Sequence, residues 1–472
     1  MFFRSQIQSR PWQWVSRLDR FDLGITLLLI LSYLGVALLP FAPNKFGDLE
    51  FHDEAKAISL AIHGAAPWTQ VAIARAPAPT LYYTIPYLFV PPGSDENTYW
   101  LAAFLWTIAW MVGALLLLRR TGEILAGPVG GKIVALLSLL SPFAVYYSYG
   151  ILAETPAYLG AVLFTYGWAR WRAAPDRRLL FSPGWGAVVV GLAIFVLSRP
   201  NAVLLLLVAL LAGIRLYYSG NPERRRAGKF TLAIVLLVGM IVAGASVAVR
   251  LLPGNPTDNP QVAYLAHVVF HGRFQFRTEP WDWRFWGKAT RVGSVDYANW
   301  THAEADLEQQ SATTGIALAT LQGNWILNDI LTHPGLTLQM TALRFLALHV
   351  TLANSQKPEA FRLGPLQGRI GYLLFHLAVN IDNFLLIVTA LWFLMRYRRD
   401  GATYWFLWGP WLALLLFHVV TYAEPRYLFP SRVGFLIMAA MIITPLWQKI
   451  QVRLHKGRML KMGLKSGGFP PF

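Results

Sequence analysis

The sequence predicts an all-α polytopic membrane protein with about ten transmembrane helices, or eleven to thirteen if further apolar segments also cross. Only 14% of the 472 residues are charged and 55% are hydrophobic, whereas about 25% of the residues of a soluble domain are charged. Many apolar runs approach the roughly 20 residues that a helix needs to cross a bilayer. Basic residues gather between these runs, as on cytoplasmic loops. Membrane topology therefore explains the net charge of +17 better than nucleic-acid binding does.

The first half of the chain is predicted to contain six spans, at 21–41, 98–118, 132–148, 156–171, 184–198 and 201–217. The basic N-terminus is placed in the cytoplasm, and the first apolar run is interpreted as a retained span because no convincing cleavage site follows it. Arg119 and Arg120 mark a return to the cytoplasm, whereas Glu154 lies outside. The Pro-rich stretch after the first span is too broken for a straight span and is interpreted as a loop.

Four further spans are predicted in the second half, at 230–252, 370–395, 402–420 and 429–447. The polar segment 253–367 has 8 basic and 9 acidic residues, so its net charge is −1 and it is placed outside. Within it, 337–353 is apolar, but a crossing there would reverse every later loop, so an amphipathic or partly inserted outer segment is preferred. The predicted organisation is one integral membrane domain (1–448) with outer regions at 42–97 and 253–367, followed by a basic cytoplasmic tail (449–472).

An acidic cluster follows the first span, in the stretch KFGDLEFHDEAKAISLAIHG (45–64). It contains four of the 24 acidic residues of the chain, namely Asp48, Glu50, Asp53 and Glu54. A short surface helix is predicted over 52–63, with Asp48 and Glu50 in a solvated loop before it. Asp53 and Glu54 would then lie at the membrane interface. Acids at a helix start also offset the helix dipole, so a structural and a catalytic role both stay open.

The predicted topology brings charged residues from other segments to the same outer face. Glu154 lies at the end of a span, Arg199 in the turn SRPN, and Arg426 and Arg432 in the stretch EPRYLFPSR. The forked guanidinium group of Arg matches phosphate, and a carboxylate can take a proton from a hydroxyl group. These residues predict a site for transfer from a lipid phosphate at the outer leaflet. An acid at a span end can also simply reach water.

Several motifs occur in an order that covers most of the chain: HDEAKAISLAIHG (52–64), PAPTLYYTIPYLF (77–89), SPFAVYYSYGILAETPAYLGAVLFTYGWARW (141–171), THPGLTLQMTALRFL (332–346) and EPRYLFP (424–430). Each motif alone is weak. The ordered set resembles the GT-C glycosyltransferases, above all the aminoarabinose transferase that modifies lipid A and the protein O-mannosyltransferases. The resemblance therefore predicts a GT-C-like fold.

The resemblance also implies an activity, which is transfer of a sugar from a polyprenyl-phosphate-linked donor to an acceptor hydroxyl or phosphate, with inversion. Asp53 would be the base and Glu54 its neighbour in the same motif. Arg426 would lie near the donor phosphate. Relatives carry a Lys before the paired prolines, and Arg75 is the nearest replacement here. The predicted substrate- and phosphate-binding set is completed by Glu154, Arg199, Tyr82 and Tyr427.

The implied partners are the lipid-linked donor, a lipid, glycan or protein acceptor, and membrane lipids, without nucleic acid. The implied location is the plasma (inner) membrane, with the active site on its periplasmic or extracellular face. No cofactor or metal ligand is assigned, and divalent metal use stays open because GT-C members differ. Since only a short tail follows the last span, acceptor recognition is expected from outer segments or a partner.

Two other functions fit a polytopic chain, namely a lipid or sugar transporter or flippase, and a non-catalytic scaffold of a glycan assembly system. Transporters often contain inverted repeats, and no repeat is evident here. His267 and His271 have i, i+4 spacing, but no acid completes a metal motif. The stretch WDWRFW (281–286) is interpreted as an interfacial belt, with sugar stacking as the alternative.

Overall fold

The computed structural model describes residues 19–38, 49–73, 76–174, 184–254, 260–278, 293–350, 366–423 and 425–461. Every regular element in these ranges is helical, which confirms the predicted all-α class. Six of the described helical segments are long and apolar enough to cross a membrane: Arg20–Ala37, Glu96–Leu140, Pro222–Arg250, His376–Arg396, Gly401–Val420 and Arg426–Leu454. The predicted number of about ten spans is therefore not confirmed by the described residues.

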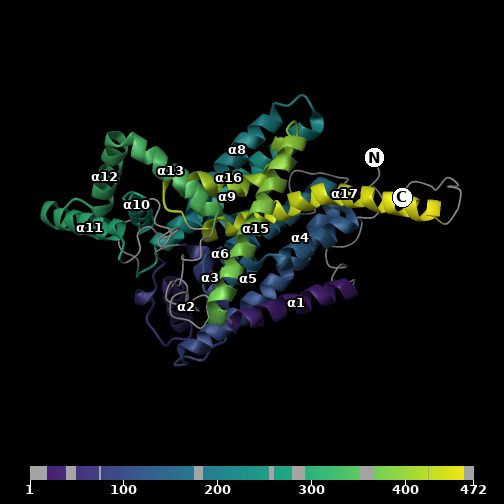
Figure 1. The fold of residues 1–472 in the computed structure, drawn as a ribbon. Helices are drawn as coiled ribbons and strands as arrows, with labels where there is room; N and C mark the ends of the chain where they lie inside the picture. Colours follow the sequence, from purple (N-terminus) through teal and green to yellow (C-terminus); the bar gives the residue numbers. More distant parts are fainter. Residues whose placement is uncertain are drawn as a thin grey trace.

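The helices of the first half are α1 (Arg20–Ala37), α2 (Leu49–Ile62), α3 (Pro77–Tyr87), α4 (Glu96–Leu140), α5 (Pro142–Ser148), α6 (Glu154–Ala173), α7 (Trp185–Ser198) and α8 (Val203–Tyr217). Those of the second half are α9 (Pro222–Arg250), α10 (Pro260–Gly272), α11 (Val295–Thr314), α12 (Leu318–Thr332), α13 (Pro334–His349), α15 (Leu366–Arg396), α16 (Trp405–Val420), the 3-10 helix η6 (Pro425–Ser431) and α17 (Arg432–Lys461). Figure 1 shows the long helices gathered in one bundle, with α10 to α12 at one end of it.

Helix α4 doubles back on itself at Gly127, where φ is 78° and Pro128 follows. A Cβ atom added at Gly122 would lie 2.7 Å from Val134 Cγ2 and 2.9 Å from the Gly130 carbonyl oxygen. Twelve residues of straight helix would separate Gly122 from Val134 by about 18 Å. The two arms of α4 therefore lie side by side, as the two predicted spans 98–118 and 132–148 require.

The sequence-based prediction is wrong about one helix boundary and about the structure of one predicted loop. The second arm of α4 ends at Leu140 and a new helix, α5, begins at Pro142, so 132–148 is not one continuous helix. The Pro-rich stretch after α2 is not a loop, because it forms α3. A Pro in the first helical turn loses no hydrogen bond, and Pro77 has that position, while Pro86 lies near the end of the helix.

The hairpin of α6 and α7 packs through glycines spaced seven residues apart, with Gly160 and Gly167 of α6 opposite Gly191 of α7 and Gly184, the residue before α7. A Cβ atom at Gly160 would lie 2.7 Å from the Gly191 carbonyl oxygen, and one at Gly167 would lie 2.7 Å from the Gly184 carbonyl oxygen. Glycine at these positions lets the two backbones approach closely, as at small-residue interfaces of membrane helices. This close packing fixes the start of α6 relative to the end of α7.

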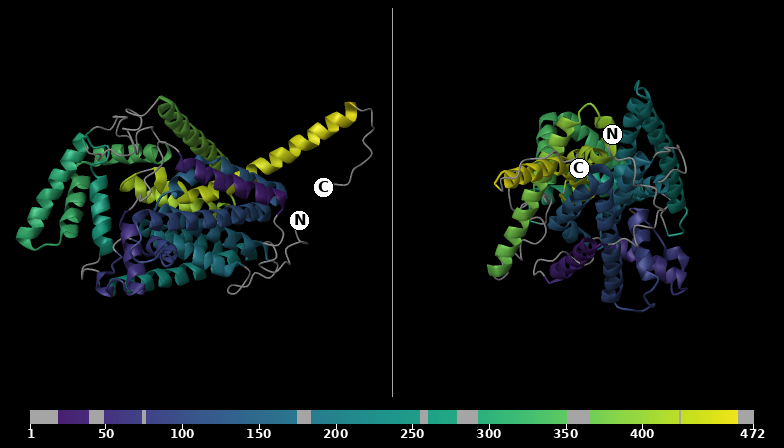
Figure 2. Two further views of the ribbon diagram at one scale, coloured as in Figure 1. Left: turned by 90° about the horizontal axis from the view of Figure 1, so that it is seen from below. Right: turned by 90° about the vertical axis from the view of Figure 1, so that its right-hand side faces the viewer.

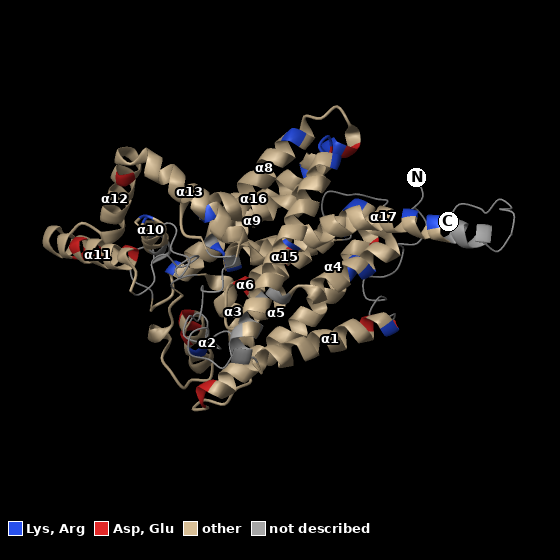
Figure 3. Cartoon of the chain, in the orientation of Figure 1, with Lys and Arg blue, Asp and Glu red and all other residues tan. Residues whose placement is uncertain are grey.

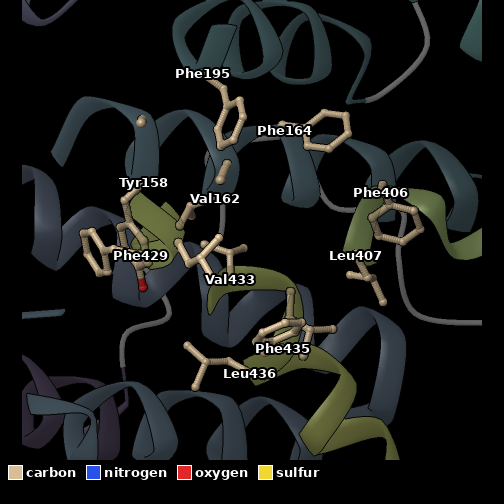
Figure 4. Close-up of a cluster of buried hydrophobic side chains, with 14 of the residues drawn as sticks. Tyr158, Val162, Phe164, Phe195, Phe406, Leu407, Phe429, Val433, Phe435 and Leu436 are labelled. Atoms are coloured by element: carbon tan, nitrogen blue, oxygen red, sulfur yellow. The ribbon is translucent and has the colours of Figure 1, made fainter. Parts of the chain in front are cut away.

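The main hydrophobic core surrounds this hairpin (Figure 4). Val162 and Phe164 of α6 lie beside Phe195 of α7. The Tyr158 ring of α6 stacks on the Phe429 ring of η6, with centroids 4.6 Å apart and an interplanar angle of 4°. The same cluster contains residues of α16 and α17, so the polar turn between those two helices is held against the first turns of α6.

Helices α10 to α13 account for most of the described part of the polar segment 253–367. Figure 2 shows α11 and α12 standing away from the bundle. Helix α13 has 16 residues and is not among the candidate spans of the described residues, so the outer position of the apolar segment 337–353 stays a prediction. The buried Arg344 of α13 donates hydrogen bonds to the carbonyl oxygens of Val420 (3.0 Å) and Gly272, which ties α13 to both α16 and α10.

Charge is distributed unevenly over the described helices (Figure 3). Basic side chains gather where the two arms of α4 meet, at the α8–α9 turn and along the end of α17, whereas acidic side chains mark α2, α11 and α12. Helix α17 continues to Lys461, well beyond the predicted end of the last span at 447. The first half of the predicted basic tail is therefore helical.

Candidate functional site

A buried ion pair lies where α6 begins and α7 ends. Glu154 is the first residue of α6, and Arg199 directly follows α7. The Arg199 guanidinium pairs with Glu154 Oε1. The Glu154 side chain is only 1% exposed, and that of Arg199 is 12% exposed. The glycine packing of α6 on α7 explains this pair, because it brings the two helix ends together.

Arg426 and Tyr427 of η6 complete the cluster on the other side. Arg426 Nε lies 3.6 Å from Glu154 Oε1, so two guanidinium groups share one carboxylate. The guanidinium carbons of Arg199 and Arg426 lie 4.7 Å and 5.3 Å from the centre of the Tyr427 ring. Both cations can be stabilised by that ring face. The structure thus brings together four residues that the sequence assigned to substrate or phosphate binding.

His418 and Asn201 belong to the same cluster, and sequence analysis missed both. The His418 ring stacks on the Tyr427 ring with centroids 4.3 Å apart. Its Nδ1 donates to the Tyr422 carbonyl oxygen (2.8 Å), and its Nε2 accepts from the Asn201 amide (2.8 Å). In this arrangement the imidazole is neutral. Asn201 could have been found from its place in SRPN, whereas His418 lies in an apolar span without a local motif.

The electrostatics of the cluster favour an anion. Two guanidinium groups face one carboxylate, and the His418 ring adds no charge, so the cluster carries an excess of one positive charge. Both guanidinium groups approach Oε1 of the buried Glu154, and because each guanidinium carries five N–H donors, one carboxylate oxygen cannot occupy them all. Arg forks bind phosphate in this kind of setting. The geometry is therefore suited to hold a phosphate group against the exposed sides of the two arginines.

The acidic helix α2 extends from Leu49 to Ile62, so it begins earlier than the predicted 52–63 and includes Glu50. Asp53 is exposed on it, whereas Glu54 is half-buried and accepts a hydrogen bond from Thr80 Oγ1 of α3 (2.5 Å). The buried His52 contacts the Tyr87 hydroxyl through Nδ1 (2.7 Å). These contacts fix α2 and leave the Asp53 carboxylate accessible. Asp48 lies outside the described residues.

Helix α3 connects α2 to the segment that leads into Glu154. The Tyr83 hydroxyl donates to the Leu152 carbonyl oxygen and accepts from the Leu152 amide, both at 3.0 Å. Phe51 of α2, Tyr83 of α3 and Ala153, the residue before Glu154, belong to one buried hydrophobic cluster. The helix that carries Asp53 and the start of α6 therefore share a core.

Three other residues of the predicted outer face lie elsewhere or outside the described ranges. The Tyr82 hydroxyl donates to Thr107 Oγ1 of α4 (3.3 Å), so this side chain contacts α4. Burial raises the pKa of Tyr82 well above its usual value, so the hydroxyl is neutral. Arg432 pairs with Asp382 of α15. Arg75 and the stretch 281–286 lie outside the described residues.

A second ionic cluster, also missed from the sequence, holds the outer helices together. Asp329 of α12 pairs with Arg273 (2.5 Å) and Arg277 (2.9 Å), which follow the end of α10 at Gly272. Burial alone would raise the pKa of Asp329, but the hydrogen bonds from the two arginines outweigh it and hold that pKa below its usual value. His267 Nδ1 lies 2.9 Å from Glu304 Oε1, and within the described residues no three potential metal ligands gather.

The fold and its apolar helices fit an all-helical integral membrane protein. Comparisons with protein families, curated protein sequences and solved structures found no match to this chain.

Proposed function

We propose that the protein is a membrane glycosyltransferase that uses a polyprenyl-phosphate-linked sugar as donor. The observation that carries the proposal is the cluster in which Arg199 and Arg426 face one buried carboxylate and stack on Tyr427. This cluster would hold the donor phosphate. The predicted topology would place it at the outer leaflet of the plasma (inner) membrane, where the lipid tail of the donor could stay in the bilayer.

Asp53 would accept the proton of the acceptor hydroxyl as the oxygen attacks the anomeric carbon of the sugar. The bond between that carbon and the phosphate oxygen would break, and polyprenyl phosphate would leave with its negative charge stabilised by the arginines. Attack opposite the leaving phosphate would invert the anomeric centre. Glu54, fixed by Thr80, would support the local geometry of α2. The exposure of Asp53 supports this role because a base must be reachable by the acceptor.

The test uses purified protein, radiolabelled polyprenyl-phosphate sugars and a membrane lipid extract as the acceptor source. We expect Asp53→Asn to lower the transfer rate by at least about 100-fold, the usual contribution of a general base. Glu50→Gln is the matched control, since Glu50 is an exposed acid on the same helix and should leave the rate near that of the parent. If Asp53→Asn transfers sugar as fast as the parent, the proposed mechanism is wrong.

The main alternative, a lipid transporter or flippase, makes a different prediction for the same charged residues. A transporter would expose Arg199 and Glu154 alternately to the two sides of the membrane. Their pairing at one pair of helix ends favours a static binding site. Accessibility labelling of cysteines introduced at Ser198 and Thr155, next to the ion pair, would separate the two functions. Labelling of both positions from the two sides of the membrane would favour transport.

A further inference from the structure

We infer that Glu154 weakens binding of a doubly charged phosphomonoester relative to a singly charged phosphodiester at the arginine cluster. The inference rests on the proposed function, in which the donor is a phosphodiester and the released product is polyprenyl monophosphate. A phosphomonoester carries about −1.5 to −2 charges at pH 7, because its second pKa is about 6. Glu154 would thus limit how tightly the site holds its own product.

The accessibility of the three charged groups supports this role. The side chains of Arg199 and Arg426 are 12% and 19% exposed, whereas that of Glu154 is 1% exposed. An entering phosphate therefore meets the guanidinium groups first, and the carboxylate stays on their closed side. Oε1 of Glu154 contacts the Arg199 guanidinium and lies 3.6 Å from Arg426 Nε, so the negative charge of the carboxylate acts directly on both cations.

The charge balance gives the size of the effect. Glu154 neutralises one of the two guanidinium charges, so the site presents a net charge of +1. A second negative charge on the ligand would be repelled by Glu154 across a guanidinium group. At an effective dielectric of about 20, two like unit charges within about 12 Å of each other repel strongly enough to lower the affinity at least about tenfold. Tyr427 and the neutral His418 complete the surroundings of the cluster and add no compensating charge.

The experiment measures equilibrium binding of farnesyl phosphate and its methyl phosphodiester to the full-length protein in lipid nanodiscs at pH 8. We expect Glu154→Gln to raise the affinity for the monoester at least about tenfold more than the affinity for the diester. At pH 5, where the monoester carries about one charge, the same variant should change both affinities equally. Glu123→Gln is the control, because Glu123 is a paired carboxylate on the first arm of α4 and should not change the ratio.

The outcomes separate this inference from the proposed function. If Glu154→Gln changes both affinities by the same factor at pH 8, the inference is overturned while the phosphate site stands. If the parent protein binds neither probe, the phosphate site of the proposed function fails. If Glu154→Gln does not fold, the inference is tested on the parent protein alone, by measuring both affinities at pH 5 and at pH 8. Its affinity for the monoester, relative to that for the diester, should rise by less than about tenfold from pH 5 to pH 8, and a larger rise overturns the inference.

Discussion

Replacing Gly191 with Ala should force α6 and α7 apart and loosen the Glu154–Arg199 pair. The added Cβ atom would lie 2.7 Å from the Gly160 carbonyl oxygen and 2.8 Å from Phe164 Cα. Real Cβ atoms essentially never approach closer than 3.0 Å, and backbone atoms of a helix cannot swing aside as a side chain does. Overpacking of this kind costs about 1–3 kcal/mol, against about 1 kcal/mol gained from the higher helix propensity of Ala.

Gly186→Ala is the matched control, because Gly186 lies on the same helix and an added Cβ atom there would have nothing within 4 Å. This variant gains the propensity without the clash. In SDS titrations followed by tryptophan fluorescence, the free energy of unfolding of Gly191→Ala should therefore be about 1–3 kcal/mol lower than that of Gly186→Ala. Farnesyl phosphate affinity should fall only in Gly191→Ala. Equal stabilities of the two variants would refute the argument from close packing.

Two further predictions concern the outer helices. Asp329→Asn should lower the free energy of unfolding by about 3–5 kcal/mol, because it leaves the two arginines that pair with Asp329 without their counter-charge. Since the folded-state pKa of Asp329 is lowered, its contribution is complete above the unfolded value of about 3.9 and is lost as pH falls through the folded value. The parent should therefore lose stability between pH 5 and pH 3 more steeply than the Asn variant does, and equal slopes would contradict this assignment. Gln275→Leu removes two hydrogen bonds to the buried Ala423, each 2.8 Å long, and leaving the Ala423 amide and carbonyl without partners should cost about 1–3 kcal/mol each. Because Ala423 lies three residues before Arg426, Gln275→Leu should also weaken farnesyl phosphate binding. Gln309→Leu, at an exposed position of α11, is the control and should leave binding unchanged. Unchanged binding in Gln275→Leu would show that the turn at 421–423 keeps its position without these hydrogen bonds.

Much of the helical organisation was accessible from the sequence because apolar length and basic flanks report directly on membrane spans. The hairpin at 184–217 has nearly its predicted bounds. Arg119 and Arg120 predict that the chain turns back after 98–118, and α4 makes this turn at Gly127 and Pro128. The Pro-rich stretch forms a helix because Pro77 starts α3, where proline costs no hydrogen bond. The loop prediction for this stretch is wrong because a single residue type has opposite effects at different helix positions.

The candidate site was predictable only in part. Placing Glu154, Arg199 and Arg426 on the same face required topology alone, and the structure brings all three into contact. Topology cannot predict stacking partners, so His418 was not found. The buried partners of Asp329 were missed for a similar reason, since 56 residues separate it from Arg273. Contacts over such separations depend on packing that no local pattern encodes.

Backbone groups in and just before the turn at 421–423 hydrogen-bond to segments far away in the sequence. Gln275 pairs with both the amide and the carbonyl group of Ala423, and Arg344 takes the carbonyl oxygen of Val420. A Cβ atom at Gly272 would overlap the Thr421 backbone. The position of Arg426, three residues further on, is therefore set by α10 and α13. The outer helices are for this reason not an exchangeable module, and a chimera that replaced 253–367 would have to carry Gln275, Gly272 and Arg344 with it.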